Sequence, residues 1–220
     1  IEITKESKSY NIAKITKLIK PSPNRIKPKC QHFGKCGSCQ IQNLNYPAQL
    51  KFKENVVKQS LQRIGGLSDI KIDPIIGSDQ QFFYRNKVQI PIIFDQRIEL
   101  GYYQTNSHQV EPMKECPLQP ADFTTIALEL KNFFRKHNLK IYNEKTGRGL
   151  LRHLVIRKSD YTKEIMIGLV INKKTFPREK ALITKIKKIN ELLKEFKITS
   201  IVLNINTAKN NVILGAESFA

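Results

Sequence analysis

The sequence lacks long apolar runs and has few acidic residues. No run of eighteen apolar residues occurs, as a membrane-spanning helix would need, and the N-terminal residues carry no secretory hydrophobic segment. No Gly-x-Gly-x-x-Gly motif follows a predicted strand. These absences favour a cytoplasmic protein whose sequence offers no nucleotide cofactor pocket of its own.

Basic residues outnumber acidic residues two to one. The chain has 38 Lys and Arg against 19 Asp and Glu, a formal net charge of +19. Such an excess is typical of proteins that neutralise phosphates, so a polyanionic partner is expected. An anionic membrane surface or an acidic protein would attract the same charge, and that alternative stays open.

The length and the ends of the chain indicate several small domains within a longer protein. A chain of 220 residues with 40% hydrophobic content is long enough for two or three small domains. Pro21, Pro23 and Pro28 mark a linker, because proline fixes φ and removes a backbone donor. The missing initiator methionine and the ending at Ala220 suggest a piece of something longer.

The periodicity predicts three helices that alternate with pairs of strands. Gly65 and Gly66 are expected to end the first helix, and Asp95-Gln96 is expected to form a hairpin turn. This order predicts an α+β fold, with an antiparallel or mixed sheet and helices on one side. The expected elements are a helix over 46–64, strands over 82–94 and 97–103, a helix over 123–134, strands over 150–157 and 164–171, a helix from Pro177, and strands over 199–206 and 211–214.

The four cysteines form one constellation. The spacing is Cys30-x5-Cys36-x2-Cys39, and Cys116 lies next to Pro117. Three grouped thiols with a distant fourth favour an iron–sulfur cluster, whereas structural zinc sites more often use two pairs. By chemistry alone the two metals are about equally expected, and unrelated buried thiols are the weaker alternative.

The residues around these cysteines carry a family resemblance. They resemble, in the same order along the chain, blocks of the S-adenosylmethionine-dependent RNA uracil-5-methyltransferases of the 23S ribosomal RNA type that contain an iron–sulfur cluster. Those blocks are Cys30-Gln31-His32-Phe33-Gly34-Lys35-Cys36-Gly37-Ser38-Cys39-Gln40, Tyr84-Arg85-Asn86-Lys87, Gly101-Tyr102-Tyr103, Cys116-Pro117-Leu118, Arg152-His153-Leu154-Val155 and Asn204-Ile205-Asn206.

The resemblance implies a specific domain arrangement. Residues 1–28 would be the C-terminal part of an OB-like TRAM β barrel, residues 29–45 the cluster loop, and residues 46–220 a central α/β RNA-binding domain. The Rossmann-like methyltransferase domain, which binds S-adenosylmethionine in this family, would be absent. No catalytic residue would then lie in this chain, and the chain alone would be inactive.

The resemblance also implies a metal site and an RNA-binding surface. A [4Fe–4S] cluster would be held by Cys30, Cys36, Cys39 and Cys116. The partner would be RNA, ribosomal rather than transfer RNA, bound by a monomer that contacts no membrane. A zinc- or cluster-bearing RNA-binding module without enzymatic activity is the alternative. The residues expected to contact RNA, for which ordinary surface or capping roles stay open, are Arg85, Asn86, Lys87, Tyr103, His108, Arg152 and His153.

Overall fold

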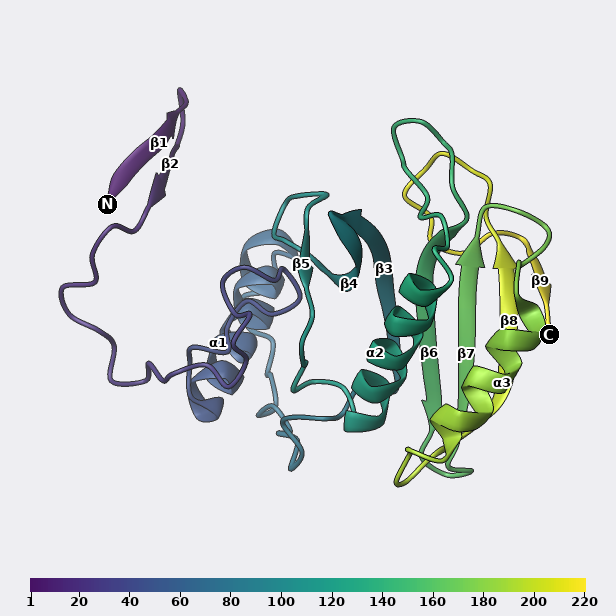
Figure 1. Ribbon diagram of the computed structural model, residues 1–220. Helices are drawn as coiled ribbons and strands as arrows, with labels where there is room; N and C mark the ends of the chain where they lie inside the picture. Colours follow the sequence, from purple (N-terminus) through teal and green to yellow (C-terminus); the bar gives the residue numbers. More distant parts are fainter. The chain divides into compact units, whose positions relative to one another are not determined.

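The computed structural model describes residues 1–220 and divides into two compact units (Figure 1). The N-terminal unit comprises residues 1–28 and 41–77, and the sheet unit comprises residues 29–40 and 78–220. This division differs from the expected one, which placed residues 46–77 with the sheet.

The N-terminal unit contains a hairpin and one long helix. Strands β1 (Glu2–Glu6) and β2 (Asn11–Lys14) are antiparallel, and helix α1 (Tyr46–Gln59) continues into a π-helical turn (Ser60–Ile64). Asn45 caps α1 by accepting a hydrogen bond from the Ala48 backbone N–H at 3.0 Å. Gly66 has a φ of +66° just after the helix. The predicted helix and its glycine ending are confirmed.

The expected C-terminal part of a TRAM barrel is not shown by residues 1–28, which contain one hairpin. Strands β1 and β2 pair only with each other, and every residue of both strands is exposed. A barrel needs a closed sheet with side chains filling its interior. A two-stranded hairpin without a buried residue encloses no such interior.

The sheet unit is built on one mixed sheet of seven strands. Its spatial order is β5-β4-β3-β6-β7-β8-β9, and only the β7–β8 pair is parallel. Helix α3 (Glu179–Asn190) forms the crossover between that parallel pair. The strands are β3 (Lys87–Asp95), β4 (Arg97–Tyr103), β5 (Val110–Pro112), β6 (Leu151–Ser159), β7 (Glu164–Ile171), β8 (Lys197–Ile205) and β9 (Glu217–Phe219).

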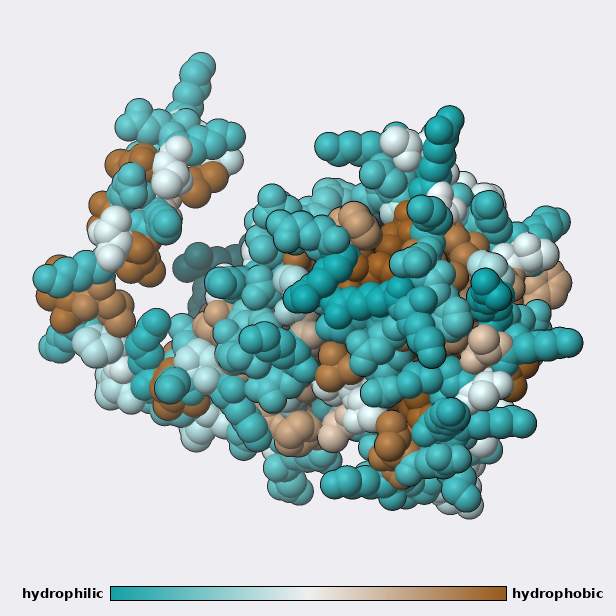
Figure 2. Space-filling model, viewed as in Figure 1, coloured by the Kyte–Doolittle hydropathy of each residue, from teal (hydrophilic) through white to brown (hydrophobic).

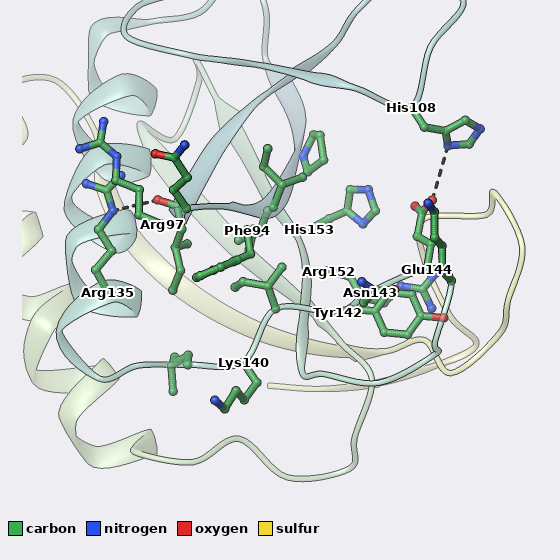
Figure 3. Close-up of a pocket in the computed structure, with 18 of the residues that line it drawn as sticks. Phe94, Arg97, His108, Arg135, Lys140, Tyr142, Asn143, Glu144, Arg152 and His153 are labelled. Carbon is green, nitrogen blue, oxygen red and sulfur yellow. Dashed lines mark hydrogen bonds and ion pairs between the residues drawn. The ribbon is translucent and has the colours of Figure 1, made fainter.

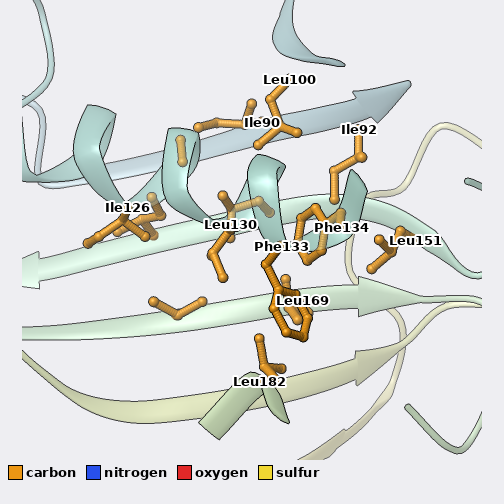
Figure 4. Close-up of a cluster of buried hydrophobic side chains, with 14 of the residues drawn as sticks. Ile90, Ile92, Leu100, Ile126, Leu130, Phe133, Phe134, Leu151, Leu169 and Leu182 are labelled. Carbon is orange, nitrogen blue, oxygen red and sulfur yellow. The ribbon is translucent and has the colours of Figure 1, made fainter. Parts of the chain in front are cut away.

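Helices α2 (Ala121–Lys136) and α3 cover one face of this sheet (Figure 1). The apolar stripe of α2, including Leu130 and Phe134, packs on β3, β4 and β7, as Figure 4 shows. Leu182 of α3 joins the same cluster. The core forms here because α2 and the sheet each present a continuous apolar surface that must be removed from water.

A buried carboxylate ties α2 to β4. Glu99 accepts hydrogen bonds from Lys131 Nζ at 3.1 Å, Arg135 Nη2 at 2.5 Å and Arg97 Nε at 2.7 Å. Burial alone would raise the pKa of Glu99, but these cations outweigh it and the pKa is lowered. The network therefore keeps a charged group inside the sheet unit without leaving it unpaired.

The predicted strand over residues 211–214 is wrong, because side chains bind that segment. Asn206 Nδ2 donates to the carbonyls of Val212 at 2.7 Å and Ile213 at 2.9 Å. Asn204 Nδ2 in turn donates to the Gly215 carbonyl at 3.0 Å. These amides occupy backbone groups that a strand ladder would use, so pairing with β8 resumes only at β9.

Replacing Leu130 by alanine tests the packing of α2 on the sheet. Leu130 is fully buried, so Leu130→Ala should lower the free energy of unfolding by about 2–5 kcal/mol through lost burial and a residual cavity. Urea unfolding followed by circular dichroism measures this change. Ile183→Ala on α3, where the side chain is 41% exposed, is the matched control and should cost much less. Equal losses in both variants would contradict the assigned core.

Candidate nucleic-acid interface

Four of the residues expected to bind RNA gather around one group of cavities. Tyr103 ends β4, His108 lies in the turn before β5, and Arg152 and His153 lie on β6. All four line one cavity of about 330 Å³ and a neighbouring cavity of about 940 Å³. Figure 3 shows the larger cavity, with Arg152 and His153 on one side.

Arg152 is buried, and the Nη1 group of its guanidinium is hydrogen-bonded within the protein. Its Nη1 donates to the carbonyls of Asn206 at 2.7 Å and Ala208 at 2.8 Å. Its guanidinium lies 4.3 Å from the centre of the Tyr142 ring. Arg152 therefore holds the chain after β8 and the Tyr142 ring beside the cavities.

His153 carries a buried nitrogen without a partner. Its side chain is 8% exposed, and Nδ1 makes no hydrogen bond in the structure. Burial, followed by the positive charge of Arg152, lowers the pKa of His153 to about 4, so its imidazole is neutral near pH 7. An unsatisfied buried polar atom costs free energy, which a ligand that hydrogen-bonds to it would recover.

A third cavity, of about 550 Å³, brings in two more of the expected residues. Arg85, Lys87, Tyr103 and His153 all line it. Asn86 does not line it, and the Asn86 backbone carbonyl accepts a hydrogen bond from the Lys158 N–H at 2.8 Å. Six of the seven expected residues therefore meet around connected cavities that share Tyr103 and His153.

His108 stands at the rim of these cavities and is paired with an acid. Its Nδ1 lies 3.4 Å from Glu144 Oε2, and both side chains are mostly exposed. The Tyr103 and His108 rings are in edge contact, with centroids 6.3 Å apart. Burial raises the pKa of Tyr103, and the Glu144 carboxylate adds to that rise. Tyr103 is therefore a neutral hydrogen-bonding aromatic at physiological pH.

The cysteine loop is attached to β4 by backbone contacts. The Gly37 N–H donates to the Tyr103 carbonyl at 2.8 Å, and the Cys36 N–H donates to the His32 carbonyl at 2.9 Å. A Cβ at position 37 would lie 3.0 Å from the Thr105 backbone nitrogen, so glycine permits this close approach. The loop is thereby held beside the strand that ends in Tyr103.

Three of the cysteines raise the pKa values of their neighbours around Tyr102. Burial raises the pKa of the Cys116 thiol, and nearby Cys30 adds to that rise, while the Arg85 charge opposes it. Burial likewise raises the pKa of Tyr102, with smaller increases from Cys116 and Cys36. No group of three or more His, Cys, Asp or Glu side chains stands in a metal-holding arrangement. Four cysteines are the residue type that iron–sulfur clusters and zinc both use, but the structure does not gather them into such a site.

Several residues of the largest cavity were not predicted from the sequence. Phe94, Tyr142 and Lys140 line it (Figure 3). Phe94 ends a strand next to a turn, where an apolar residue is as readily part of a core. Residues 138–145 have no strong periodic pattern. The only available signal was the mixture of aromatic and basic residues around position 142.

Relatives of this chain carry the name RNA methyltransferase. A Clostridium tetani protein named "Uncharacterized RNA methyltransferase" is 38% identical over 220 residues, which cover 99% of this chain and 46% of that protein. A Clostridium acetobutylicum protein of the same description is 39% identical over 217 residues, 97% of this chain and 46% of its own length. No protein-family model matches the chain.

The fold also matches a solved enzyme structure. The Pyrococcus abyssi tRNA (uracil-54, C5)-methyltransferase, crystallised with S-adenosyl-L-homocysteine, superposes with a TM-score of 0.66 and 25% identity. The match covers 98% of this chain and 46% of that one. The chain is similar to part of these methyltransferases. It spans about half the length of the curated relatives it matches.

This match overturns the fold class expected from the sequence. The sequence predicted a partial β barrel followed by a central domain. The Rossmann-like methyltransferase domain was expected to be absent. Instead, 98% of the chain aligns with a methyltransferase chain crystallised with S-adenosyl-L-homocysteine. The expected fold class, a fragment that lacks the methyltransferase domain, is therefore wrong. None of its helices is long and apolar enough to cross a membrane.

The low pKa of His153 predicts a pH-dependent stability. An unfolded histidine titrates near 6.5 and the folded His153 near 4, so between these values only the unfolded chain gains the proton. The titration of His153 should therefore lower the free energy of unfolding by about 3 kcal/mol from pH 6.5 to pH 4. Below pH 4 this contribution should level off, because both the folded and the unfolded chain then bind the proton.

Urea unfolding across this pH range, compared between the wild-type protein and His153→Gln, isolates the contribution of one imidazole. The variant should lose most of that pH dependence, whereas His108→Gln, at an exposed histidine, should keep it. An unchanged pH slope in His153→Gln would show that the imidazole is not buried in its neutral form.

Proposed function

We propose that the protein is an S-adenosylmethionine-dependent RNA methyltransferase that modifies the C5 carbon of a uridine, and that the sheet unit of this chain binds the RNA. The similarity to named RNA methyltransferases over nearly the whole chain carries this proposal. The solved enzyme of similar fold acts on uracil C5 and was crystallised with the demethylated form of that methyl donor.

The charge and the cavities support an RNA substrate. A net charge of +19 provides the electrostatic attraction that nucleic acid binding needs. Arg85 and Lys87 stand at a cavity that also contains Tyr103, so a cation for phosphate lies beside an aromatic ring for a base. Arg152 acts within this proposal by positioning Tyr142 and the chain after β8, since its Nη1 group is bound to two backbone carbonyls and its guanidinium lies on the Tyr142 ring.

Methylation at C5 needs covalent activation of the base. The C5 carbon of uracil is a poor nucleophile, and addition of a thiolate to the neighbouring C6 makes it reactive. We assign all four cysteines of this chain to a metal site, so none of them is that thiolate. We place the enzyme in the cytoplasm, where it would act as a monomer.

The proposed target is 23S ribosomal RNA, because the motifs around the cysteines resemble that type of enzyme. Transfer RNA is the second candidate, and the Pyrococcus abyssi enzyme of similar fold favours it. In the organism that encodes the protein, deletion of its gene should remove one 5-methyluridine from 23S ribosomal RNA. Mass spectrometry of nucleosides from separately purified ribosomal and transfer RNA measures this loss.

Each outcome of that experiment decides between the candidates. Loss from transfer RNA alone would replace ribosomal RNA by the second candidate. Unchanged 5-methyluridine in both RNA classes would contradict the proposed function. Re-expression of the full-length gene is the control and should restore the modification.

We propose that Cys30, Cys36, Cys39 and Cys116 hold a [4Fe–4S] cluster with a structural role. Uracil methylation transfers no electrons from the protein, so the cluster would join the loop of residues 29–40 to the segment after β5. The electrostatic proximity of Cys30 to Cys116 supports this grouping. Zinc on the same thiolates is the alternative, since both metals accept four cysteines.

Metal analysis of anaerobically purified protein tests the cluster. The wild-type protein should contain iron and acid-labile sulfide, and Cys116→Ser should lose most of both because one of four ligands is removed. Ser38→Ala, within the same loop but without a thiolate, is the matched control and should retain them. Zinc without sulfide in the wild-type protein would replace the cluster by the alternative.

A further inference from the structure

The cavity shown in Figure 3 extends well beyond the residues expected to bind RNA. It has a volume of about 940 Å³ and lies between the turn that joins β3 to β4 and the segment after α2. His153 and Tyr103 line it, and so do Phe94, Arg97 and Lys140, which lie away from His153 in Figure 3. A cleft of this size holds more than one small planar group.

Phe94 gives this cavity an exposed aromatic ring. It is the eighth residue of β3, and it is 69% exposed although its neighbours Ile92 and Ile98 are buried. Figure 2 shows a brown hydrophobic patch ringed by teal side chains near the upper end of α2 in this view. An open ring on a rigid strand is a surface on which a nucleobase can stack, because every base has a flat π face.

The rim of the cavity carries more positive than negative charge. Five cationic side chains line it, but Arg97 and Arg135 pair with Glu99 and Arg152 is buried, so Lys140 and Lys145 are the exposed, unshared cations set against the carboxylate of Glu144. Arg97 is 72% exposed at its side chain, and Lys140 and Lys145 are exposed as well. This balance attracts phosphate and disfavours an uncharged or basic occupant.

The inner wall offers a hydrogen-bonding group that no protein atom uses. The Nδ1 atom of His153 is buried and unpartnered, and its ring stands between Phe94 and the Tyr142–Arg152 pair in Figure 3. A neutral imidazole nitrogen either donates or accepts one hydrogen bond, depending on its tautomer. It therefore suits the edge of a nucleobase, which presents both donors and acceptors.

We propose that this cavity, here called the Phe94 pocket, binds an unpaired segment of the RNA, with one base stacked on Phe94 and another base edge hydrogen-bonded to His153. Lys140 and Lys145 contact the phosphates that join these nucleotides. This inference rests on the proposed RNA substrate. It further specifies the part of the protein at which an unpaired stretch of that RNA binds. It assigns Phe94, Lys140 and Lys145 to binding, none of which the motifs indicated.

Binding of a single-stranded RNA decamer to the full chain, measured by fluorescence anisotropy at fixed salt, tests the Phe94 pocket. Phe94→Ala should weaken binding by about 5- to 100-fold, because it removes one stacking surface. Phe94→Tyr should restore most of the affinity. The exposure of Phe94 means that the variant should keep its fold, which circular dichroism checks.

Two controls separate stacking from charge. Tyr161→Ala removes an aromatic ring that is 96% exposed and lies outside the pocket, so it should leave binding unchanged. A decamer of the same length built from abasic ribose-phosphate should bind more weakly and equally to the wild-type protein and Phe94→Ala. A Phe94→Ala defect that persists with the abasic decamer would overturn base stacking.

Other outcomes distinguish a failure of the pocket from a failure of the proposed function. If Phe94→Ala binds the decamer as tightly as the wild-type protein while Lys87→Ala binds it more weakly, RNA binding stands and the Phe94 pocket is wrong. If the wild-type protein binds no RNA, both proposals are wrong. Phe94-dependent binding of an acidic peptide, without base-dependent RNA binding, would assign the cavity to a protein partner instead.

Discussion

The arrangement of the cavities depends on the contacts that the guanidinium group of Arg152 makes inside the sheet unit. A buried cation must be paired or hydrogen-bonded, and Arg152 satisfies this need with two backbone carbonyls and the face of Tyr142. Those partners come from the chain after β8 and the chain after α2, which are distant in sequence. One side chain on β6 thus assembles walls of two cavities, both of which His153 also lines.

The amides of Asn204 and Asn206 extend this arrangement toward the end of the chain. They bind backbone carbonyls between residues 212 and 217, so side-chain amides hold residues 211–214, where a strand was expected. The segment then places Ile213 at two of the cavities. A motif that resembles a sequence block of a methyltransferase family thus consists of asparagine amides that fix the backbone beside two cavities.

The cysteine loop and the cavities share one strand. Residues 29–40 join β4 through the Gly37 contact with the Tyr103 carbonyl, and Tyr103 lines all three cavities. A metal held by the four cysteines would therefore stabilise the strand end that carries Tyr103. This connection offers a physical reason for a cluster in a protein whose proposed reaction transfers no electrons.

The sequence by itself determined the local elements and the charge. Periodic apolar residues predicted α1, α2, α3 and the two hairpins, since amphipathic patterns report which face of an element is buried. The tertiary structure alone decided the burial of Arg152, the unpartnered nitrogen of His153 and the exposure of Phe94. Each of these depends on contacts between segments far apart in the chain. The sequence alone does not tell whether an arginine, histidine or phenylalanine is buried in internal hydrogen bonds or exposed at a cavity.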